Sequence, residues 1–444
     1  MSTRRDFVAQ VAASLTATTP AVADNAVDDP SSNRAQRRAA SSPIDIKSVV
    51  RRDDTILRLG GSGDNYPITW IADDRQLVSV TDGFGWLQDP KGRYAARLWG
   101  LSGDPYHSKF EDLGGYPDLV QGIGENYCRY LGYGTLAVDG RIYQSLNTPN
   151  YPPNIWLDSK MIGAKLIYSP DGGRTWHNQD GTTPVVWEDW YDRSAKNLLF
   201  FREPNDAFSF LSFLQMGRDY ALNRDGYVYV YSPNGNYEGR MNELVMARVP
   251  KQRVANRSAY EFFAGLSDRD AVWSKDIAAR SIVHTFPTGY VNRARHTGDD
   301  HPFAWCPSIA YNAALDLYLM ANWGMSCSSD GIYFAGPSYL GFWAAAHPWG
   351  PWIQIYEEKE SRPANERESR CYSPQIAPKW IAQDGKSFWL VWTDCRGVLD
   401  PRAKDVFRRE LPTDPRKKME LIKLRQQITP YYMFNTQRFD LHIL

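Results

Sequence analysis

The sequence has no long apolar run, few cysteines and no excess of charge of either sign. Its 444 residues contain no apolar stretch of about 18 residues, so no transmembrane helix is predicted. The five cysteines form no C-x-x-C pair, which argues against a structural zinc site, and their odd number leaves at least one thiol unpaired. With 51 basic and 51 acidic residues, neither nucleic acid nor an anionic membrane is expected as the main partner.

Aromatic residues are abundant. The chain has 16 Trp and 26 Tyr, and aromatic residues make up 14% of the sequence. Because aromatic faces stack on the apolar faces of sugars, such an excess often lines carbohydrate-binding surfaces. Bladed β folds also pack Trp and Tyr between their sheets. The composition fits both uses.

The N-terminus is interpreted as an export signal. Residues 3–8, Thr-Arg-Arg-Asp-Phe-Val, resemble the twin-arginine signal of bacteria, and a weakly apolar stretch and an Ala-Val-Ala cleavage site at 21–23 follow. The alternative is a chance Arg-Arg start on a cytosolic protein. Residues 1–23 are therefore predicted as a signal peptide and 24–52, which lack periodicity, as a disordered linker. The mature protein is expected to be periplasmic or secreted.

From residue 53 onward the sequence consists of short β-type runs separated by Gly, Pro, Asn and Asp. Two helices are expected, at 251–263 as a cap on a blade and at 416–427 near the C-terminus. The expected strands after the first hairpin are 135–138, 141–146, 165–168, 227–231, 244–249, 308–311, 318–323, 339–344, 352–356, 376–381, 388–393 and 431–444.

Two patterns identify the kind of β fold. Residues 169–176 match the Asp-box, S-x-D-x-G-x-T-W, which lies on hairpin turns of β-propellers, so Asp171 is interpreted as structural. Trp-Ile-Ala at 70–72 and Thr-Asp at 81–82 are echoed by Trp-Ile-Ala at 380–382 and Thr-Asp at 393–394. The predicted fold is an all-β β-propeller in one domain over 53–444, with a charged excursion at about 396–430. We expect the C-terminal strand to complete the blade begun by the N-terminal residues.

The first predicted hairpin carries an aspartate among glycines at each end. Residues 66–72 and 76–81 read as its strands; Asp64 precedes the first and Asp82 follows the second. Antiparallel strands fold back, so both carboxylates are expected at one edge of the sheet, with Trp70 and Trp86 nearby. A catalytic pair is one interpretation. Two ordinary turn aspartates are the other.

Several motifs resemble a bacterial β-propeller family long labelled only as a domain of unknown function. They are Gly-Asp-Asn-Tyr-Pro-Ile-Thr-Trp at 63–70, Asp-Gly-Phe-Gly at 82–85, Asn-Arg-Asp-Gly-Tyr-Val-Tyr-Val-Tyr at 223–231, Glu-Phe-Phe-Ala-Gly at 261–265 and Pro-Trp-Gly-Pro-Trp at 348–352. Some members are endo-D-arabinanases, glycoside hydrolases with five blades, whose proposed catalytic aspartates match Asp64 and Asp82. The resemblance thus implies a five-bladed glycan-active enzyme; the subgroup-specific segments leave the sugar open.

A glycosidase needs one protonated carboxyl group and one ionised carboxylate, which a close aspartate pair can supply. Substrate contacts are expected from a set of aromatic, acidic and basic residues: Trp70, Trp86, Glu203, Asp206, Arg224, Tyr290, Arg293, His301, Trp305 and Trp323. For Glu203 and Asp206 an ordinary salt-bridged loop is the competing interpretation.

Two other functions stay open. Polysaccharide lyases on propeller folds use His or Tyr as base and acid and Arg to neutralise a uronate, and Tyr290, Arg293, His296 and His301 crowd one segment. A propeller that only binds sugar is the third possibility. In each case the expected partner is a polysaccharide or oligosaccharide, the chain is expected to be a monomer, and no metal or cofactor is expected.

Overall fold

The computed structural model describes residues 45–120, 130–149, 161–188, 192–194, 196–235, 242–287, 306–324, 338–366, 369–394, 406, 409, 412–428 and 433–444. These residues belong to one compact unit, Ile44–Leu444. The predicted signal peptide lies outside the described residues, as does most of the predicted linker. Strand β1 begins at Ile46, so the end of the predicted linker is wrong: residues 46–52 already belong to a sheet.

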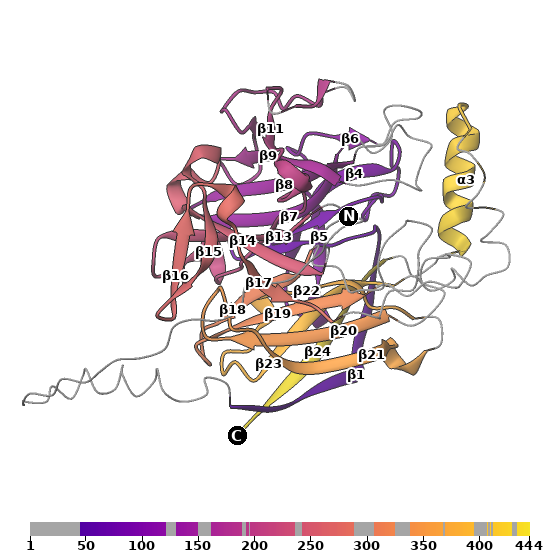
Figure 1. Ribbon diagram of the computed structural model, residues 1–444. Coiled ribbons are helices and arrows are strands. Elements are labelled where there is room, and N and C mark those ends of the chain that lie inside the picture. Colours follow the sequence, from indigo (N-terminus) through magenta and orange to yellow (C-terminus); the bar gives the residue numbers. More distant parts are fainter. Residues whose placement is uncertain are drawn as a thin grey trace, which may run out of the picture. The chain divides into compact units, whose positions relative to one another are not determined.

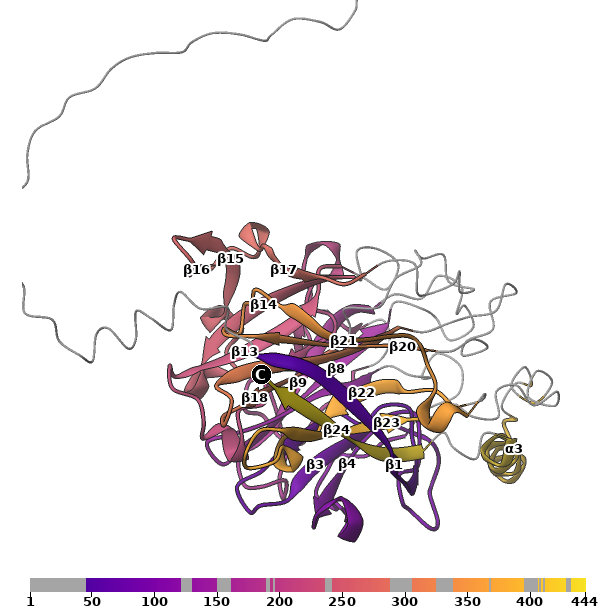
Figure 2. The same ribbon diagram turned by 90° about the horizontal axis from the view of Figure 1, so that it is seen from below.

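Within the described residues the strands form five antiparallel sheets, which follow one another around the molecule in chain order (Figures 1 and 2). This is the predicted β-propeller with five blades. Blade 1 has β2 (Ile68–Trp70), β3 (Gln76–Val80), β4 (Tyr94–Ser102), β5 (Lys109–Asp112) and β6 (Leu119–Val120), and blade 2 has β7 (Leu131–Val138), β8 (Arg141–Pro149), β9 (Met161–Ser169), β10 (His177–Asn178) and β11 (Leu199–Phe201). Blade 3 has β12 (Ser212–Phe213), β13 (Tyr227–Pro233), β14 (Glu243–Pro250), β15 (Glu261–Ser267), β16 (Asp270–Ser274) and β17 (Ile282–Thr285). Blade 4 has β18 (Ser308–Asn312), β19 (Leu317–Gly324), β20 (Ser338–Ala345) and β21 (Ile353–Ser361), and blade 5 has β22 (Tyr372–Ile376), β23 (Ser387–Thr393), β24 (Met433–Ile443) and β1 (Ile46–Ser62).

The first strand of each blade faces the axis. A small void there is lined by residues of all five blades, among them Pro67, Tyr133, Ser212, Ser308 and Gln375, and its volume of about 10 Å³ has room for about one water molecule. The bridge between Gln215 and Ala310 is parallel, as expected for innermost strands that run the same way. The N-terminal ends of these strands therefore share one face of the propeller, which we call the mouth.

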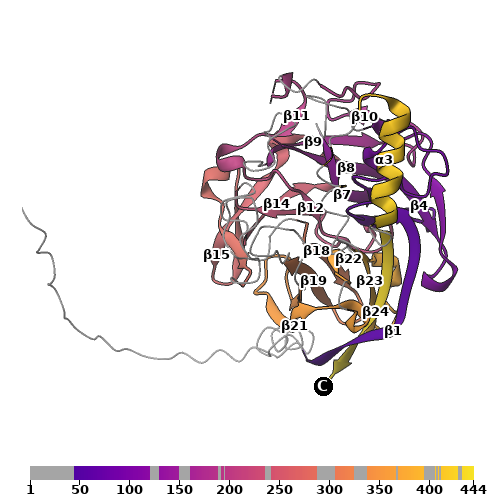
Figure 3. The same cartoon turned by 90° about the vertical axis from the view of Figure 1, so that its right-hand side faces the viewer.

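The fifth blade is built from both ends of the chain. β24 lies between β23 and β1, and Figure 3 shows the yellow C-terminal strand against the indigo N-terminal one. The predicted completion of a blade by the C-terminal strand is thereby confirmed. β1 ends at Ser62, two residues before Asp64, so the closure of the ring leads directly into the predicted site.

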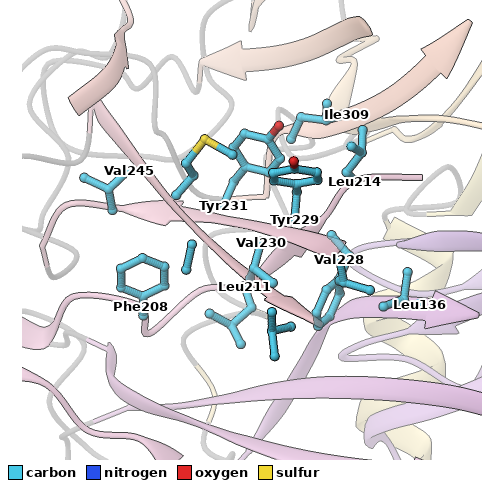
Figure 4. Packing of buried hydrophobic residues seen from close by; sticks show 14 of the residues in the cluster. Leu136, Phe208, Leu211, Leu214, Val228, Tyr229, Val230, Tyr231, Val245 and Ile309 are labelled. Atoms are coloured by element: carbon cyan, nitrogen blue, oxygen red, sulfur yellow. The ribbon is translucent and has the colours of Figure 1, made fainter. Parts of the chain in front are cut away.

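The blades pack on each other through buried apolar faces. The largest cluster joins strands of blades 2, 3 and 4, and Figure 4 shows Leu136, Val228, Tyr231 and Ile309 within it. All residues of β7 are buried, because neighbouring blades cover both of its faces. This explains why buried residues do not alternate with exposed ones along β7.

Two local predictions are wrong and one is confirmed. The predicted helix at 251–263 is two short 3-10 turns, Lys251–Arg253 and Arg257–Ala259, followed by β15. The predicted strand at 376–381 is the end of β22 and a 3-10 turn, Pro378–Trp380, since Pro378 has no backbone N–H for a sheet and suits the first position of a turn. The C-terminal helix is present as α3 (Pro415–Ile428). No helix among the described residues is long and apolar enough to cross a membrane.

The Asp-box has the structural role predicted for it. It follows β9, and the Asp171 carboxylate accepts hydrogen bonds from the Thr175 amide and hydroxyl at 2.9 and 2.8 Å and from the Arg174 amide at 3.1 Å. Burial alone would raise its pKa, but these hydrogen bonds lower the pKa of Asp171 to about 2. Trp176 is buried against Tyr116 of blade 1.

Candidate functional site

Asp64 and Asp82 lie beside the same backbone contact at the mouth. Beyond β2 and β3 the ladder is irregular, because the Thr81 amide donates to the Asn65 carbonyl at 3.4 Å while the Thr81 carbonyl accepts from the Asp64 amide at 2.7 Å. Asn65 and Asp64 therefore both face Thr81, the residue before Asp82. The predicted placement of both carboxylates at one sheet edge agrees with this geometry. Their catalytic role stays a prediction.

A tight turn fixes Asp82. Its φ of 51° lies in the left-handed region, which Asp and Asn tolerate better than most residues. At Gly83 a Cβ would lie 1.9 Å from the Ser62 carbonyl oxygen, so only glycine fits there. Ser62 and Gly85 exchange backbone hydrogen bonds of 2.8 Å in both directions. The Asp-Gly-Phe-Gly motif thus allows this turn to pack closely against the end of β1.

Arg93 holds the same turn from the other side. Its Nε donates to the Asp82 carbonyl at 2.5 Å, and its guanidinium lies 3.7 Å from the Asp82 carboxylate. The exposed fractions of the two side chains are 26% and 14%, so the ion pair is half-buried. Sequence reasoning missed Arg93, which lies eleven residues beyond Asp82.

Asp64 affects the pKa values of groups on two different blades. Burial and, after it, the negative charge of Asp64 raise the pKa of the Tyr66 hydroxyl and of the Cys306 thiol well above their usual ranges. Cys306 lies two residues before β18, the innermost strand of blade 4, so the charge of Asp64 acts on a residue of a non-adjacent blade. Cys306 and Cys371 are free and buried, and a protonated Cys306 is not an activated nucleophile.

Blade 2 contributes a buried ionic cluster to the mouth. Glu188 accepts from the Tyr130 hydroxyl at 2.5 Å and from the Lys165 ammonium at 2.9 Å. Burial lowers the pKa of Lys165, although the Glu188 charge opposes that shift. Arg193 lies 5.8 Å from the Tyr130 ring and donates to Thr148. No sequence motif marked this cluster, whose members come from four separate segments.

Blade 5 repeats the layout of blade 1. Asp394 ends β23 as Asp82 ends β3, which agrees with the internal repeat found in the sequence. It accepts from the Ser369 hydroxyl at 2.6 Å and from the Arg370 amide at 2.7 Å, and Arg58 lies 3.6 Å away. Burial outweighs these contacts and raises the pKa of Asp394 to about 6.

Unsatisfied polar groups line the boundary of blades 2 and 3. A Cβ on Gly134 would lie 2.3 Å from the Leu211 carbonyl and 3.2 Å from the Ser145 Cβ. Gly134, Ser145 and Leu211 therefore lie at about the same distance from the mouth. Asn147 and Ser209 are each two residues, or about 7 Å, nearer the mouth. They are 1% and 0% exposed, and neither amide atom of Asn147 nor the Ser209 hydroxyl has a hydrogen-bond partner among the described residues. Leaving such groups unpaired costs free energy unless a water or a ligand satisfies them.

Three of the four predicted tryptophans lie among the described residues, and they are separated from one another. Trp70 lies at the far end of β2, six residues or about 20 Å from Asp64, and donates to Asp74. Trp86 is partly buried and stacks on Phe110 with the ring centroids 3.7 Å apart, and its role as a sugar platform stays a prediction. Trp323 is at the mouth end of β19 but fully buried against Tyr372.

The polar residues that were predicted to contact substrate also lie in different parts of the structure. Glu203 is bound to Arg257 at 2.5 Å, and Asp206 follows it in a short 3-10 turn, as expected for an ordinary salt-bridged loop. Arg224 lies before β13, at the face opposite the mouth, and is 3.8 Å from Asp316. The structure therefore separates Arg224 from the aspartate pair.

Four candidates are not placed by the structure. Tyr290, Arg293, His301 and Trp305 lie outside the described residues, so the proposed lyase constellation has no geometry to test it. Within the ranges that are described, no group of three or more His, Cys, Asp or Glu side chains could hold a metal ion.

Several solved structures are similar to this chain. A protein of Bacteroides ovatus ATCC 8483 aligns with a TM-score of 0.45 and 12% identity over 86% of this chain and 87% of its own. The catalytic domain of a Coprinopsis cinerea GH62 alpha-L-arabinofuranosidase gives 0.42 and 10% over 86% and 95%. An endo-arabinase of Bacteroides thetaiotaomicron VPI-5482 gives 0.41 and 13% over 78% and 93%.

Among curated proteins no relative matches the sequence. A protein-family model does match, across blade 2, blade 3 and the segment that follows them. The resemblance expected from the motifs is thereby confirmed. The model, which covers residues 135–301, is that of the family described as Domain of unknown function (DUF4185).

Proposed function

We propose that the mouth is the active site of a glycoside hydrolase and that Asp64 and Asp82 carry the reaction. The observation that supports this most directly is that one hairpin carries both residues to the mouth, where the Asp64 amide donates to the carbonyl of Thr81, the residue before Asp82. Two carboxyl groups held close together do not both ionise readily, so one keeps its proton near neutral pH. An acid and a carboxylate in one site are what glycosidic cleavage needs.

The reaction follows from this pair. The protonated carboxyl group gives its proton to the glycosidic oxygen as the bond from that oxygen to the anomeric carbon breaks. The ionised carboxylate either removes a proton from the attacking water or attacks the anomeric carbon itself. In both routes the products are one sugar hydroxyl and one reducing end, with water consumed.

The surroundings favour a sugar as substrate. Asn147 and Ser209 offer donors and acceptors that have no partner among the described residues, and sugar hydroxyl groups can supply partners to both kinds. The motifs shared with endo-D-arabinanases direct the choice of polymer to arabinan. The export signal predicted in residues 1–23 would deliver the enzyme to the periplasm or outside the cell, where such polymers occur.

The test is a screen of the full-length chain against arabinan, galactofuran, ulvan and rhamnogalacturonan-type polymers. A hydrolase releases reducing ends without near-ultraviolet absorbance. A lyase leaves an unsaturated uronate that absorbs there, and a binding module retains the polymer and releases nothing. We expect reducing ends from arabinan that disappear in Asp82→Asn. Either of the other two outcomes contradicts the proposal.

A further inference from the structure

We infer that Ser373 is a substrate-binding residue whose hydroxyl group binds a hydroxyl group of the sugar held at the mouth. This rests on the proposed function, since it adds a contact to the same site. Ser373 is the second residue of β22, the innermost strand of blade 5, and it lies at the mouth end of that strand. No sequence motif indicated it.

The backbone at Ser373 is strained. Its φ of 48° lies in the left-handed region, which residues other than Gly, Asn and Asp seldom adopt. The next residue is Pro374, and a proline normally keeps the residue before it extended. The pairing of β22 with β23 shifts register between Tyr372 and Gln375, so Ser373 lies in an irregular part of the ladder. Strain and irregular pairing of this kind concentrate where a side chain is aimed at a ligand.

The Ser373 hydroxyl has no hydrogen-bond partner among the described residues, and the residue is 1% exposed. A hydroxyl group buried without a partner costs free energy that a bound water or ligand recovers. It can donate one hydrogen bond and accept two, as a sugar hydroxyl can, so the two groups are complementary. The strained backbone and the unpaired hydroxyl are thus two independent observations at one residue.

Ser373 and Asp64 lie on the mouth side of the same small void at the axis. Pro67 lines that void, and Asp64 precedes Pro67 by three residues, at most about 11 Å of chain. Gln375 lines it too, and Ser373 precedes Gln375 by two residues, at most about 7 Å of chain. A sugar that reaches the aspartate is therefore near the serine, and a hydrogen bond from Ser373 would fix the orientation of the sugar before bond cleavage.

Cys306 of blade 4 connects the same two residues. The Gln375 side-chain amide donates to the Cys306 carbonyl at 3.1 Å. Burial and, after it, the charge of Asp64 raise the pKa of the Cys306 thiol, so the aspartate acts on this residue. Cys306 is also left-handed, with a φ of 57°. Strained residues at the entrances of two neighbouring inner strands thus lie on the side of the mouth that Asp64 reaches, as expected around a bound ligand.

The first experiment needs no substrate. Melting temperatures are compared for the full-length wild type, Ser373→Ala and the matched control Ser79→Ala. Ser79 is also fully buried, but its hydroxyl accepts from the Gln144 amide at 2.7 Å. We expect Ser373→Ala, which removes an unpaired group, to melt higher by about 1 °C or more, and Ser79→Ala to melt lower. A lower melting temperature for Ser373→Ala means that the hydroxyl is satisfied inside the protein, and it overturns the inference whether or not the chain cleaves a glycan.

The second experiment measures sugar binding. Arabino-oligosaccharides are titrated calorimetrically into full-length Asp82→Asn protein, alone and combined with Ser373→Ala, Ser373→Gly or Ser79→Ala. Both Ser373 substitutions should weaken the affinity about fivefold, because each removes one hydrogen bond to the sugar, and Ser79→Ala should leave it unchanged.

Two outcomes of this titration overturn the inference while leaving the hydrolase intact. One is an unchanged affinity in Ser373→Ala. The other is a loss confined to Ser373→Gly, which relieves the left-handed strain as well and would assign the effect to the backbone. An Asp82→Asn protein that binds no sugar before any second substitution contradicts the proposed function itself, and the inference with it.

Discussion

Asn147 offers a test that separates a ligand-binding amide from a structural one. The substitution is Asn147→Leu, which keeps a similar volume and removes two hydrogen-bonding atoms that lack partners among the described residues. Relief of a buried unsatisfied group is worth about 1–3 kcal/mol. For a chain of ~400 residues, 1 kcal/mol shifts the melting temperature by about 1 °C, so we expect a rise of about 1–3 °C.

The affinity for the glycan should decrease in Asn147→Leu, although its stability should increase. Loss of one hydrogen bond to a sugar costs about 1 kcal/mol, which weakens the affinity about fivefold. The assay is calorimetric titration of arabino-oligosaccharides into Asp82→Asn protein with and without Asn147→Leu. The matched control is Asn312→Leu on blade 4, because Asn312 is equally buried but donates to the Gly385 carbonyl at 2.8 Å. That control should lose stability and keep its affinity.

The reasoning fails if Asn147→Leu behaves like Asn312→Leu. A fall in melting temperature with unchanged affinity would mean that Asn147 is satisfied internally by a bound water and has no contact with the glycan. Unchanged affinity together with the expected gain in stability would also refute the assignment, since it would leave the amide without a ligand.

Three further predictions follow from the carboxylates. Asp64→Asn and Asp82→Asn should each fold and lose about 10²–10⁴-fold in rate on arabinan, and near-normal activity in both would disprove the pair. Because the folded pKa of Asp171 is depressed to about 2, its contribution to stability is present above pH ~4 and is lost as pH falls toward 2. Asp171→Asn should abolish that pH dependence in urea unfolding without changing the rate of the folded fraction. The raised pKa of Asp394, about 6, predicts the reverse sign: stability should decline as pH rises from ~4 to ~6, and thermal melts of Asp394→Asn should lack that decline.

Local signals predicted the fold well. The Asp-Gly turn after Val138, the Asp-box around Asp171 and the first hairpin each depend on residues close in sequence, and the structure has all three. The helix expected at 251–263 failed because its apolar residues pack against blade 3 as a strand and two single turns, so tertiary contacts overrode the local pattern.

The sequence could place candidate residues together only where one hairpin contains them. Asp64 and Asp82 flank a hairpin that local residues indicate, and their catalytic role stays a prediction. Trp70 was misplaced because nearness in sequence along a strand still means opposite faces of the propeller. The bond from Tyr130 to Glu188 joins residues 58 positions apart, and no spacing rule announces it. The Arg93 contact was missed because the loop that carries it has no regular pattern.

The arrangement of blade 5 also determines when the ring can form during synthesis. Ile46 pairs with Ile443, which is 397 residues away (443 − 46). A growing chain can form the hairpins of blades 1 to 4 as they are made. The edge of β1 that pairs with β24 stays without its partner until β24 (Met433–Ile443) has left the ribosome. Until then β1 and β23 present open strand edges, which invite pairing with other chains. A frameshift or nick that removes only β24 should therefore produce a protein that aggregates, even though Asp64 and Asp82 are both present.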